Sequence, residues 1–430
     1  MAAQAGRLYG VRVARSPTTS HSNPWLRLLA VALLAGVAMG AAVGAGLSTA
    51  YLVAGLALPF ILLLTFARPH WGVSLYVVLV YADLLSILVQ YDGLPPLARF
   101  AGAILLAAVL GYRLSIRRQG LVADPMTWWL LAYGGVVALG LFYARNPGFV
   151  TPNVVEFVRI FLAYLIIINA ITTSERLYRT LMALLALAVA LAALTIYQSL
   201  TGHYENIFGG LAQVNVSEIS GGADGARPSG TLGDPNYYGQ SLIFIIPLAL
   251  YLASRGRTLF GRLGGLVATA MLIAAVIFTY SRGDALALGA VVVLALLYKR
   301  PKPIYIVGGA LLLALALPLI PSNYLARLTT VVDLAQGNQQ VILNEDSIRG
   351  RAGASQAAIA MFADHPFLGV GRENYPSYEL EYLSGTPLAK YARGIPPHNL
   401  YLEIAAENGI VGLLVVGGLL LVAWRALVEA

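Results

Sequence analysis

Long apolar runs separated by short polar connections make up most of the chain between residues 26 and 424. A helix needs a run of roughly 17–25 apolar residues to cross the hydrocarbon core of a bilayer. Twelve such runs are present, and they predict twelve membrane-spanning helices. The predicted spans cover about residues 26–46, 50–67, 71–90, 98–115, 126–143, 150–171, 177–200, 236–254, 263–280, 283–299, 303–320 and 398–424.

Two of the connections are much longer than the others. Residues 201–235 are rich in Gly, Ser and Asn, which favours a mobile loop. Residues 321–397 are long enough for a small subdomain, with a helix predicted over residues 348–363 and ended by Pro366. The chain is thus divided into a tail (1–24), eleven helices (25–320), this subdomain (321–397), and a last helix with a short tail (398–430).

The composition agrees with this pattern. Hydrophobic residues make up 58% of the chain and charged residues only 11%, whereas soluble domains carry about 25% charged residues. The sequence therefore predicts an all-α integral membrane protein. The chain has no cysteine, which excludes disulfides and cysteine-based metal sites. Its five histidines are too far apart in the sequence to suggest a metal pair, so we expect no metal site.

The basic residues indicate which helix ends face the cytoplasm. If the N-terminus is inside, 17 of the 28 Lys and Arg residues lie on the inner side of the membrane, mostly in very short connections. The positive-inside rule requires this bias. Both termini are then cytoplasmic, and the segments 201–235 and 321–397 face the outer compartment. Because topology accounts for the basic residues, the net charge of +8 alone indicates no nucleic-acid partner.

Few charged residues lie inside the predicted spans. Glu156 and Arg159 are three positions apart on one helix. We predict a structural ion pair facing the interior of the bundle, with a functional site as the alternative. Asp83 is predicted to make a polar contact between helices, and its alternative is also a site residue.

Three polar features are predicted to lie on the outer face. Arg227 lies in ARPSGTLGDPNYYG, Arg282 lies in the tight turn FTYSRGDALAL, and His398 opens the last helix. Singly, they are a solvated loop arginine, an arginine that reaches lipid phosphate, and a capping histidine. Together, they supply two guanidinium forks that match phosphate oxygens and an imidazole that accepts a proton near neutral pH. They predict a site that transfers a group from a phosphate-ester donor.

Neighbouring residues and missing motifs narrow the chemistry. Asn399 can cap the first turn of the last helix, and Glu403 either orients the His398 imidazole or pairs with another helix. The chain has no Asp-x-Asp, P-loop or GxSxG motif. These absences argue against a metal-held nucleotide sugar, ATP and a serine nucleophile. We therefore expect no cofactor and no nucleotide, and a donor that arrives already activated, such as a lipid-linked pyrophosphate.

Several segments are typical of one enzyme family. His398-Asn399, nine further residues and then Gly409-Ile410-Val411-Gly412 match the pattern H-N-x9-G-x-x-G. The segments RPSGTLGDPNYYG, SRG and MFADHPFLGVGRENY are similar to segments of the same superfamily. The chain thus resembles the O-antigen ligase family (WaaL), within the superfamily that includes Wzy polymerases and O-oligosaccharyltransferases.

The resemblance implies a specific reaction. A member of this family would transfer O-antigen polysaccharide from undecaprenyl pyrophosphate to a sugar hydroxyl of the lipid A–core, in lipopolysaccharide biosynthesis. It would act without metal at the periplasmic face of a Gram-negative inner membrane, among membrane lipids. His398 would be the catalytic base, and Arg227 and Arg282 would bind the pyrophosphate. Four further arginines are candidates for binding the acidic core of the acceptor, with a solvated basic loop as the alternative: Arg349, Arg351, Arg372 and Arg393.

The residues also favour a stereochemical outcome. No carboxylate pair suited to a double displacement is apparent in the sequence, so we predict a single displacement with inversion at the anomeric carbon. The alternatives are a Wzy-type polymerase, a protein O-oligosaccharyltransferase and, in another class, a transporter of polyprenyl-linked glycans. The absence of an internal repeat argues against the transporter.

Overall fold

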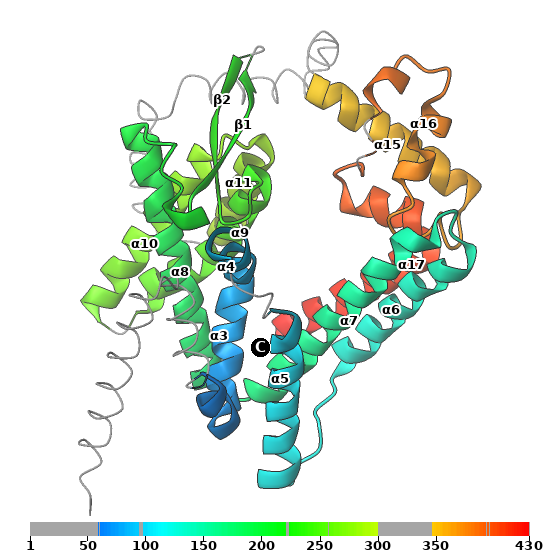
Figure 1. Ribbon diagram of the computed structural model, residues 1–430. Coiled ribbons are helices and arrows are strands. Elements are labelled where there is room, and N and C mark those ends of the chain that lie inside the picture. The colour runs from blue at the N-terminus through cyan, green and yellow to red at the C-terminus, as the bar shows by residue number, and fades with distance from the viewer. Residues whose placement is uncertain are drawn as a thin grey trace, which may run out of the picture. The chain divides into compact units, whose positions relative to one another are not determined.

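The computed structural model describes residues 59, 61–93, 98–220, 223–256, 258–299, 346–392, 394 and 396–429, all but one in the unit Ile61–Ala430. The predicted tail 1–24, the predicted spans 26–46 and 303–320, most of 50–67, and Arg393 lie outside these residues. The described part is mostly helical (Figure 1).

Six of the described helices are long and apolar enough to cross a membrane. Each coincides with a predicted span to within a few residues, because a long apolar run is the most direct sequence signal of such a helix. They are α6 (Pro125–Tyr143), α7 (Pro147–Ala170), α8 (Ser174–Thr201), α9 (Pro235–Arg255), α10 (Leu259–Phe278) and α17 (Leu400–Glu429). Two further predicted spans correspond to α5 (Ala98–Leu110), which continues as the π-helix η1 (Gly111–Ile116), and to α11 (Arg282–Lys299).

The predicted span 71–90 is not one straight helix. It is divided into α3 (Pro69–Tyr81) and α4 (Leu84–Asp92), which meet at an angle of 68°. Asp83 lies at the break with a φ of 48°, a backbone conformation that ends a helix. Its carboxylate accepts a hydrogen bond of 2.6 Å from Ser86 Oγ within the next turn. The side chain therefore serves the local turn, where a contact between helices was expected.

The segment 201–235 is also more ordered than its composition predicts. It holds a short 3-10 helix, η2 (Phe208–Gly210), and an antiparallel pair of strands, β1 (Gln213–Ser220) and β2 (Ala223–Gly230). The described part of the protein is therefore not purely α-helical. Both α8 and α9 contact β2, so the hairpin rests on the ends of these helices.

Small side chains allow the central helices to pack closely. One buried cluster joins α8, α9 and α10, where alanines such as Ala188 and Ala249 face Leu242 and Leu272. Alanine at such positions lets helix backbones approach one another. A second buried cluster joins α3, α5 and α7.

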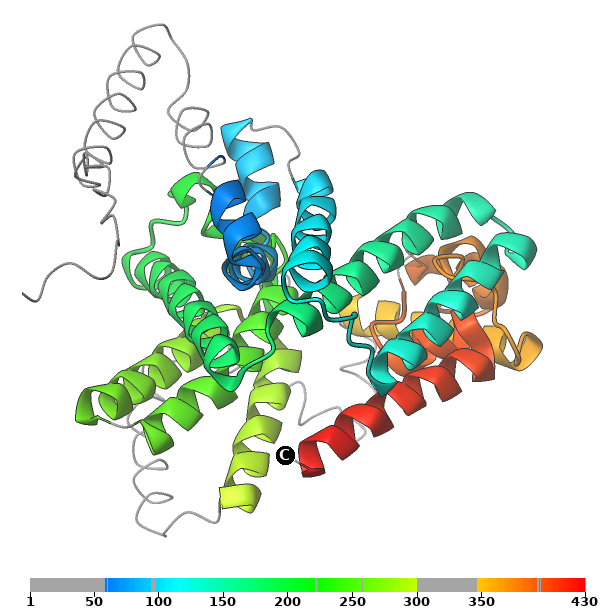
Figure 2. The ribbon, with the colours of Figure 1, turned by 90° about the horizontal axis from the view of Figure 1, so that it is seen from below.

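The predicted helix 348–363 is present as α15 (Asp346–Asp364). Together with α16 (Pro376–Leu383) and the 3-10 turn η4 (Ala389–Tyr391), it encloses a small core that includes Met361, Tyr375 and Leu383. This core also takes in Ala406 of α17. The subdomain before the last helix is thus packed directly on the start of that helix, and α6 lies beside α17 in both views (Figures 1 and 2).

The turn between α6 and α7 ties these helices to the subdomain. Tyr143 Oη donates a hydrogen bond of 2.6 Å to the Leu368 carbonyl, and the backbone N–H of Asn146 donates one of 2.8 Å to Asn374 Oδ1. Arg145 forms an ion pair of 2.9 Å with Glu381. The connection between α6 and α7 is therefore fastened to residues 368–381.

Helix α17 is interrupted at Gly409, where φ is 62° and ψ is −161°. Residues 366–371 cross at this point and replace the missing helical hydrogen bonds. The backbone N–H groups of Val370 and Gly371 donate to the carbonyls of Ala406 and Glu407 (both 2.9 Å), and that of Ile410 donates to the Pro366 carbonyl (2.8 Å). A Cβ atom on Gly409 would lie 2.3 Å from the Phe367 backbone. The first glycine of the H-N-x9-G-x-x-G pattern is thus required because the backbone of residues 366–371 passes too close to leave room for a side chain.

The ion pair predicted between Glu156 and Arg159 is present at 3.0 Å. Its predicted orientation toward the bundle interior is wrong for the described residues, since the two side chains are 56% and 60% exposed.

We expect Gly409→Ala to destabilise the protein by roughly 2–4 kcal/mol, because a left-handed backbone and a contact below van der Waals distance are both penalised. Thermal unfolding in detergent measures the effect. Gly417→Ala is the matched control, because Gly417 lies in the same helix and no atom lies within 4 Å of a Cβ placed there. Equal melting temperatures for the two variants would contradict the role of the crossing.

Candidate functional site

His398 lies immediately before α17 in a strained conformation. Its φ of 51° is in the left-handed region, which residues with a side chain rarely adopt and which often marks functional positions. Its side chain is exposed, and the preceding Pro397 is buried. Asn399 Oδ1 accepts hydrogen bonds from the backbone N–H groups of Tyr401 (3.1 Å) and Leu402 (3.3 Å). The prediction that Asn399 caps the last helix is therefore confirmed, and the cap holds the imidazole at the helix entrance.

Arg227 is buried, with 7% of its surface exposed, so the alternative of a solvated loop arginine is wrong. It lies in β2, opposite Asn215 of β1. Its Nε donates to the Thr279 carbonyl (3.0 Å) and its Nη2 donates to Asn236 Oδ1 (3.2 Å). The guanidinium is thus held between the hairpin, the start of α9 and the end of α10.

Arg282 is the first residue of α11 and is half-buried. It follows the tight turn at Tyr280, whose φ is 56°, and the buried Ser281. Asp284, two residues further on, is buried, and its backbone N–H donates to Ser281 Oγ (3.3 Å). The turn therefore presents Arg282 at the same helix ends that hold Arg227.

Electrostatic effects connect the candidate arginines. Burial lowers the pKa of Arg227; Asp234 and Asp284 oppose this, while Arg282 and Arg351 lower the pKa further. Partial desolvation and then the charge of Arg282 lower the pKa of Arg351. Arg282 therefore lies near both Arg227 and Arg351, since its positive charge lowers the pKa of each. A concentration of positive charge of this kind suits a polyanion such as pyrophosphate.

His398 is part of the same electrostatic group. Partial desolvation and then the positive charge of Arg351 lower the pKa of the imidazole, while Asp234 and Glu403 act in the opposite direction. The net shift is downward from the ordinary value of 6.5. The imidazole is therefore neutral at neutral pH and able to accept a proton.

Arg372 and Glu403 have a different arrangement from the one first expected of them. Arg372 Nη1 contacts Glu403 Oε1 (2.6 Å) and Glu407 Oε2 (3.0 Å), and the Glu407 side chain is only 1% exposed. Burial opposes the charge of Arg372, but Glu407, Tyr133 and Glu403 raise its pKa above the ordinary value. Glu403 thus forms an ion pair with Arg372, which lies in the turn before α16, whereas the alternative to orienting His398 was a contact with another helix. The contacts of Arg372 are those of a group that fastens residues 366–371 to α17.

The remaining candidate arginines are placed unequally. Arg349 is half-buried, with its Cζ 4.4 Å from the centre of the Tyr391 ring. Arg351 is exposed and lies near enough to His398 to change its pKa. Arg393 is outside the described residues. Within the part of the chain that the structure describes, no group of three or more His, Asp or Glu residues is suited to hold a metal ion.

Residues 267–417 match the family model described as O-antigen ligase. This part of the chain is similar to the O-antigen ligase family. The matched segment runs from α10 to the first half of α17 and contains Arg282, Arg351 and His398, whereas Arg227 precedes it. Together with the apolar helices, the match indicates a multi-pass membrane protein with a segment similar to a family of glycosyltransferase-like enzymes. No curated protein and no solved structure matches the chain.

Two features of the candidate site were not found from sequence. Arg351 was one of four equivalent candidates, and only the fold distinguishes it by bringing it close to both His398 and Arg282. Asp234, which caps α9 by accepting hydrogen bonds from the N–H groups of Asn236 and Tyr237, also lies near His398 and Arg227. Its position before Pro235 is a recognisable helix-start signal that carries no information about the site.

We expect Arg372→Gln to destabilise the protein by about 3–5 kcal/mol, because Glu407 would be left buried without its charged partner. Arg145→Gln breaks an exposed ion pair and should cost about 1 kcal/mol or less. Thermal unfolding compares the two variants. The double variant Arg372→Gln/Glu407→Gln should recover part of the loss, and an unchanged melting temperature for Arg372→Gln alone would contradict the fastening role.

Proposed function

We propose that the protein is an O-antigen ligase, an inverting, metal-independent glycosyltransferase. It transfers O-antigen polysaccharide from undecaprenyl pyrophosphate to a sugar hydroxyl of the lipid A–core. The proposal places the site at the periplasmic face of the inner membrane of a Gram-negative bacterium. It gives His398 the role of catalytic base, and Arg227 and Arg282 the role of binding the donor pyrophosphate.

One observation carries the proposal. The exposed imidazole of His398 is linked to Arg227 and Arg282 through the charge of Arg351, although these residues come from four different segments of the chain. A base beside clustered guanidinium groups is the combination that a phosphate-leaving transfer needs. The family match over residues 267–417 supports the same class of reaction.

The proposed step is a single displacement. The acceptor hydroxyl oxygen forms a bond to the anomeric carbon of the donor glycan as the bond from that carbon to the pyrophosphate oxygen breaks. The hydroxyl proton passes to the neutral imidazole of His398, which later releases it to water. Arg227, Arg282 and Arg351 stabilise the negative charge that grows on undecaprenyl pyrophosphate as it departs. Since pyrophosphate is already a good leaving group, no general acid is needed.

The proposal assigns different tasks to the remaining candidates. Asn399 positions the base through the helix cap. Arg349 lies on the same helix as Arg351 and is proposed to contact the acidic core of the acceptor. The contacts of Arg372 and Glu403 favour a structural role for both.

Reconstitution in liposomes with an undecaprenyl-pyrophosphate glycan and purified lipid A–core tests the reaction. The ligase is supported by product on the lipid A–core in the presence of a metal chelator and without nucleotide. Product on a second lipid-linked glycan alone would identify a polymerase instead. Movement of the donor across the membrane without transfer would identify a transporter.

In the same assay, His398→Ala should lower the rate by roughly 10²–10⁴-fold, the usual contribution of a general base. The melting temperature should stay close to that of the parent, because the side chain is exposed. His203→Ala is the matched control, since it removes another exposed histidine to which the proposed transfer gives no role. A near-normal rate for His398→Ala would exclude the proposed base.

The rate should depend on pH through His398. It should fall on acidification through a pKa below 6.5, because protonation removes the base. Arg351→Gln removes a positive charge that disfavours the imidazolium, so the acid limb of the pH–rate profile should move to higher pH. Arg145→Gln should leave the limb in place. A limb that does not move in Arg351→Gln would contradict the link between these two residues.

A further inference from the structure

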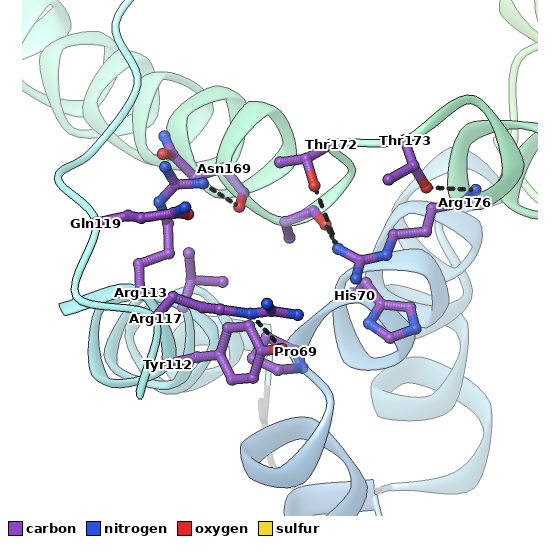
Figure 3. A pocket seen from close by; sticks show the side chains of 12 residues that line it. Pro69, His70, Tyr112, Arg113, Arg117, Gln119, Asn169, Thr172, Thr173 and Arg176 are labelled. Carbon is purple, nitrogen blue, oxygen red and sulfur yellow. Dashed lines mark hydrogen bonds between the residues drawn. The ribbon is translucent and has the colours of Figure 1, made fainter. Parts of the chain in front are cut away.

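A polar pocket lies at the opposite end of α8 from the hairpin. It has a volume of about 240 Å³ and is lined by residues at the start of α3, in η1, at the end of α7 and at the start of α8 (Figure 3). Helix α8 has 28 residues, which corresponds to a length of about 42 Å. Since the candidate active site lies beyond the far end of this helix, the pocket is a separate site.

The pocket is strongly basic. Arg113, Arg117 and Arg176 line it together with His70, and no Asp or Glu is among the lining residues. Figure 3 shows the guanidinium groups of Arg117 and Arg176 pointing into the same space. Placing three guanidinium groups around one small cavity costs electrostatic free energy, which an anion in the cavity would recover.

The arginines are held by neutral groups. Arg113 is buried, and it donates to the carbonyls of Gly120 (2.8 and 3.1 Å) and Asn169 (3.2 Å). Arg176 donates to the Ala170 carbonyl (3.0 Å) and to Thr172 Oγ1 (3.3 Å).

Arg117 donates to Tyr112 Oη (3.2 Å). Among the described residues, none of these three arginines forms an ion pair with a carboxylate. Neutral groups therefore hold these arginines, and no carboxylate in the part of the chain that the structure describes neutralises their charge.

We propose that this pocket binds the phosphate group of an anionic ligand. Guanidinium forks match phosphate oxygens, and the hydroxyls of Thr172 and Thr173 at the pocket wall are suitable further partners. The pocket is too small for a polysaccharide, so the ligand is a single headgroup or a small phosphate.

The surroundings favour a lipid headgroup as the source of this phosphate. Exposed apolar and aromatic side chains flank the pocket, including Trp71, Leu177 and Tyr178. The pocket also lies where α7 ends and α8 begins, two helices that are long and apolar enough to span a membrane. Basic pockets between helix ends at the membrane surface are typical binding sites for anionic headgroups.

Lipid titration of the purified full-length chain tests the proposal. Native mass spectrometry in detergent would follow binding of phosphatidylglycerol, phosphatidylcholine and inorganic pyrophosphate. We expect tighter binding of phosphatidylglycerol than of phosphatidylcholine. The variant Arg117→Gln/Arg176→Gln should weaken phosphatidylglycerol binding by roughly tenfold or more.

The control variant is Arg255→Gln/Arg425→Gln, which removes two exposed arginines near the ends of α9 and α17 and should bind as the parent does. Pyrophosphate binding that depends on Arg117 and Arg176, without lipid binding, would support a phosphate site filled from solution. The proposal would be overturned if none of the three probes binds, or if the two double variants lose binding equally. Arg117→Gln alone removes an exposed side chain and keeps the test valid if the double variant does not fold.

Discussion

The arrangement of the candidate active site depends on one backbone crossing. At Gly409 the hydrogen-bond ladder of α17 stops, and residues 366–371 supply the partners that the helix has lost. The crossing brings Arg372 beside Glu403 and Glu407, so a buried ion pair forms where two chain segments must stay in register. Buried ion pairs contribute little to stability by themselves, but they penalise misplacement strongly. The first turns of α17, and with them His398, therefore have a defined position.

A second constraint comes from the buried Arg227. A guanidinium with 7% exposure requires hydrogen-bond partners on several sides, and the hairpin, α9 and the carbonyl of Thr279 supply them. The hairpin thus positions the charged Arg227 side chain and also connects α8 to α9. Repulsion between three neighbouring arginines raises the free energy of the empty site. The packing of the surrounding helices must offset this repulsion. The packed alanine and leucine cluster of α8, α9 and α10 provides that stability.

Much of the helical framework follows from the sequence, because apolar runs of membrane length have few other solutions in a bilayer. The structure differs from the sequence prediction at positions where the backbone conformation or pairing of a few residues sets the local fold. The backbone at Asp83 divides a span, and Val214 and Val216 lie in a strand although the residues around them favour a loop. The glycine at 409 was recognised as part of a motif, but its reason becomes visible only when residues 366–371 are placed against it.

Some residues of the candidate site can likewise be identified from the sequence, and others only from the fold. Arg227, Arg282 and His398 are identifiable because their chemistry is unusual for the places they occupy in the sequence. Sequence could not distinguish Arg351 from the other arginines of the same loop, since its closeness to His398 is a tertiary property. The pairing of Arg372 with Glu403 was equally hidden, because these residues are 31 positions apart. Long-range contacts of this kind leave no periodic signal along the chain.

The interruption at Gly409 also divides α17 mechanically. Its first nine residues, 400–408, are bonded to residues 370–375 of the subdomain, while the remainder continues as an apolar rod beside α6. A rigid-body displacement of the subdomain would carry the first segment, and the imidazole in front of it, without moving the membrane anchor. A load on α15 or α16 would therefore be transmitted to His398 and would leave the rest of α17 in place.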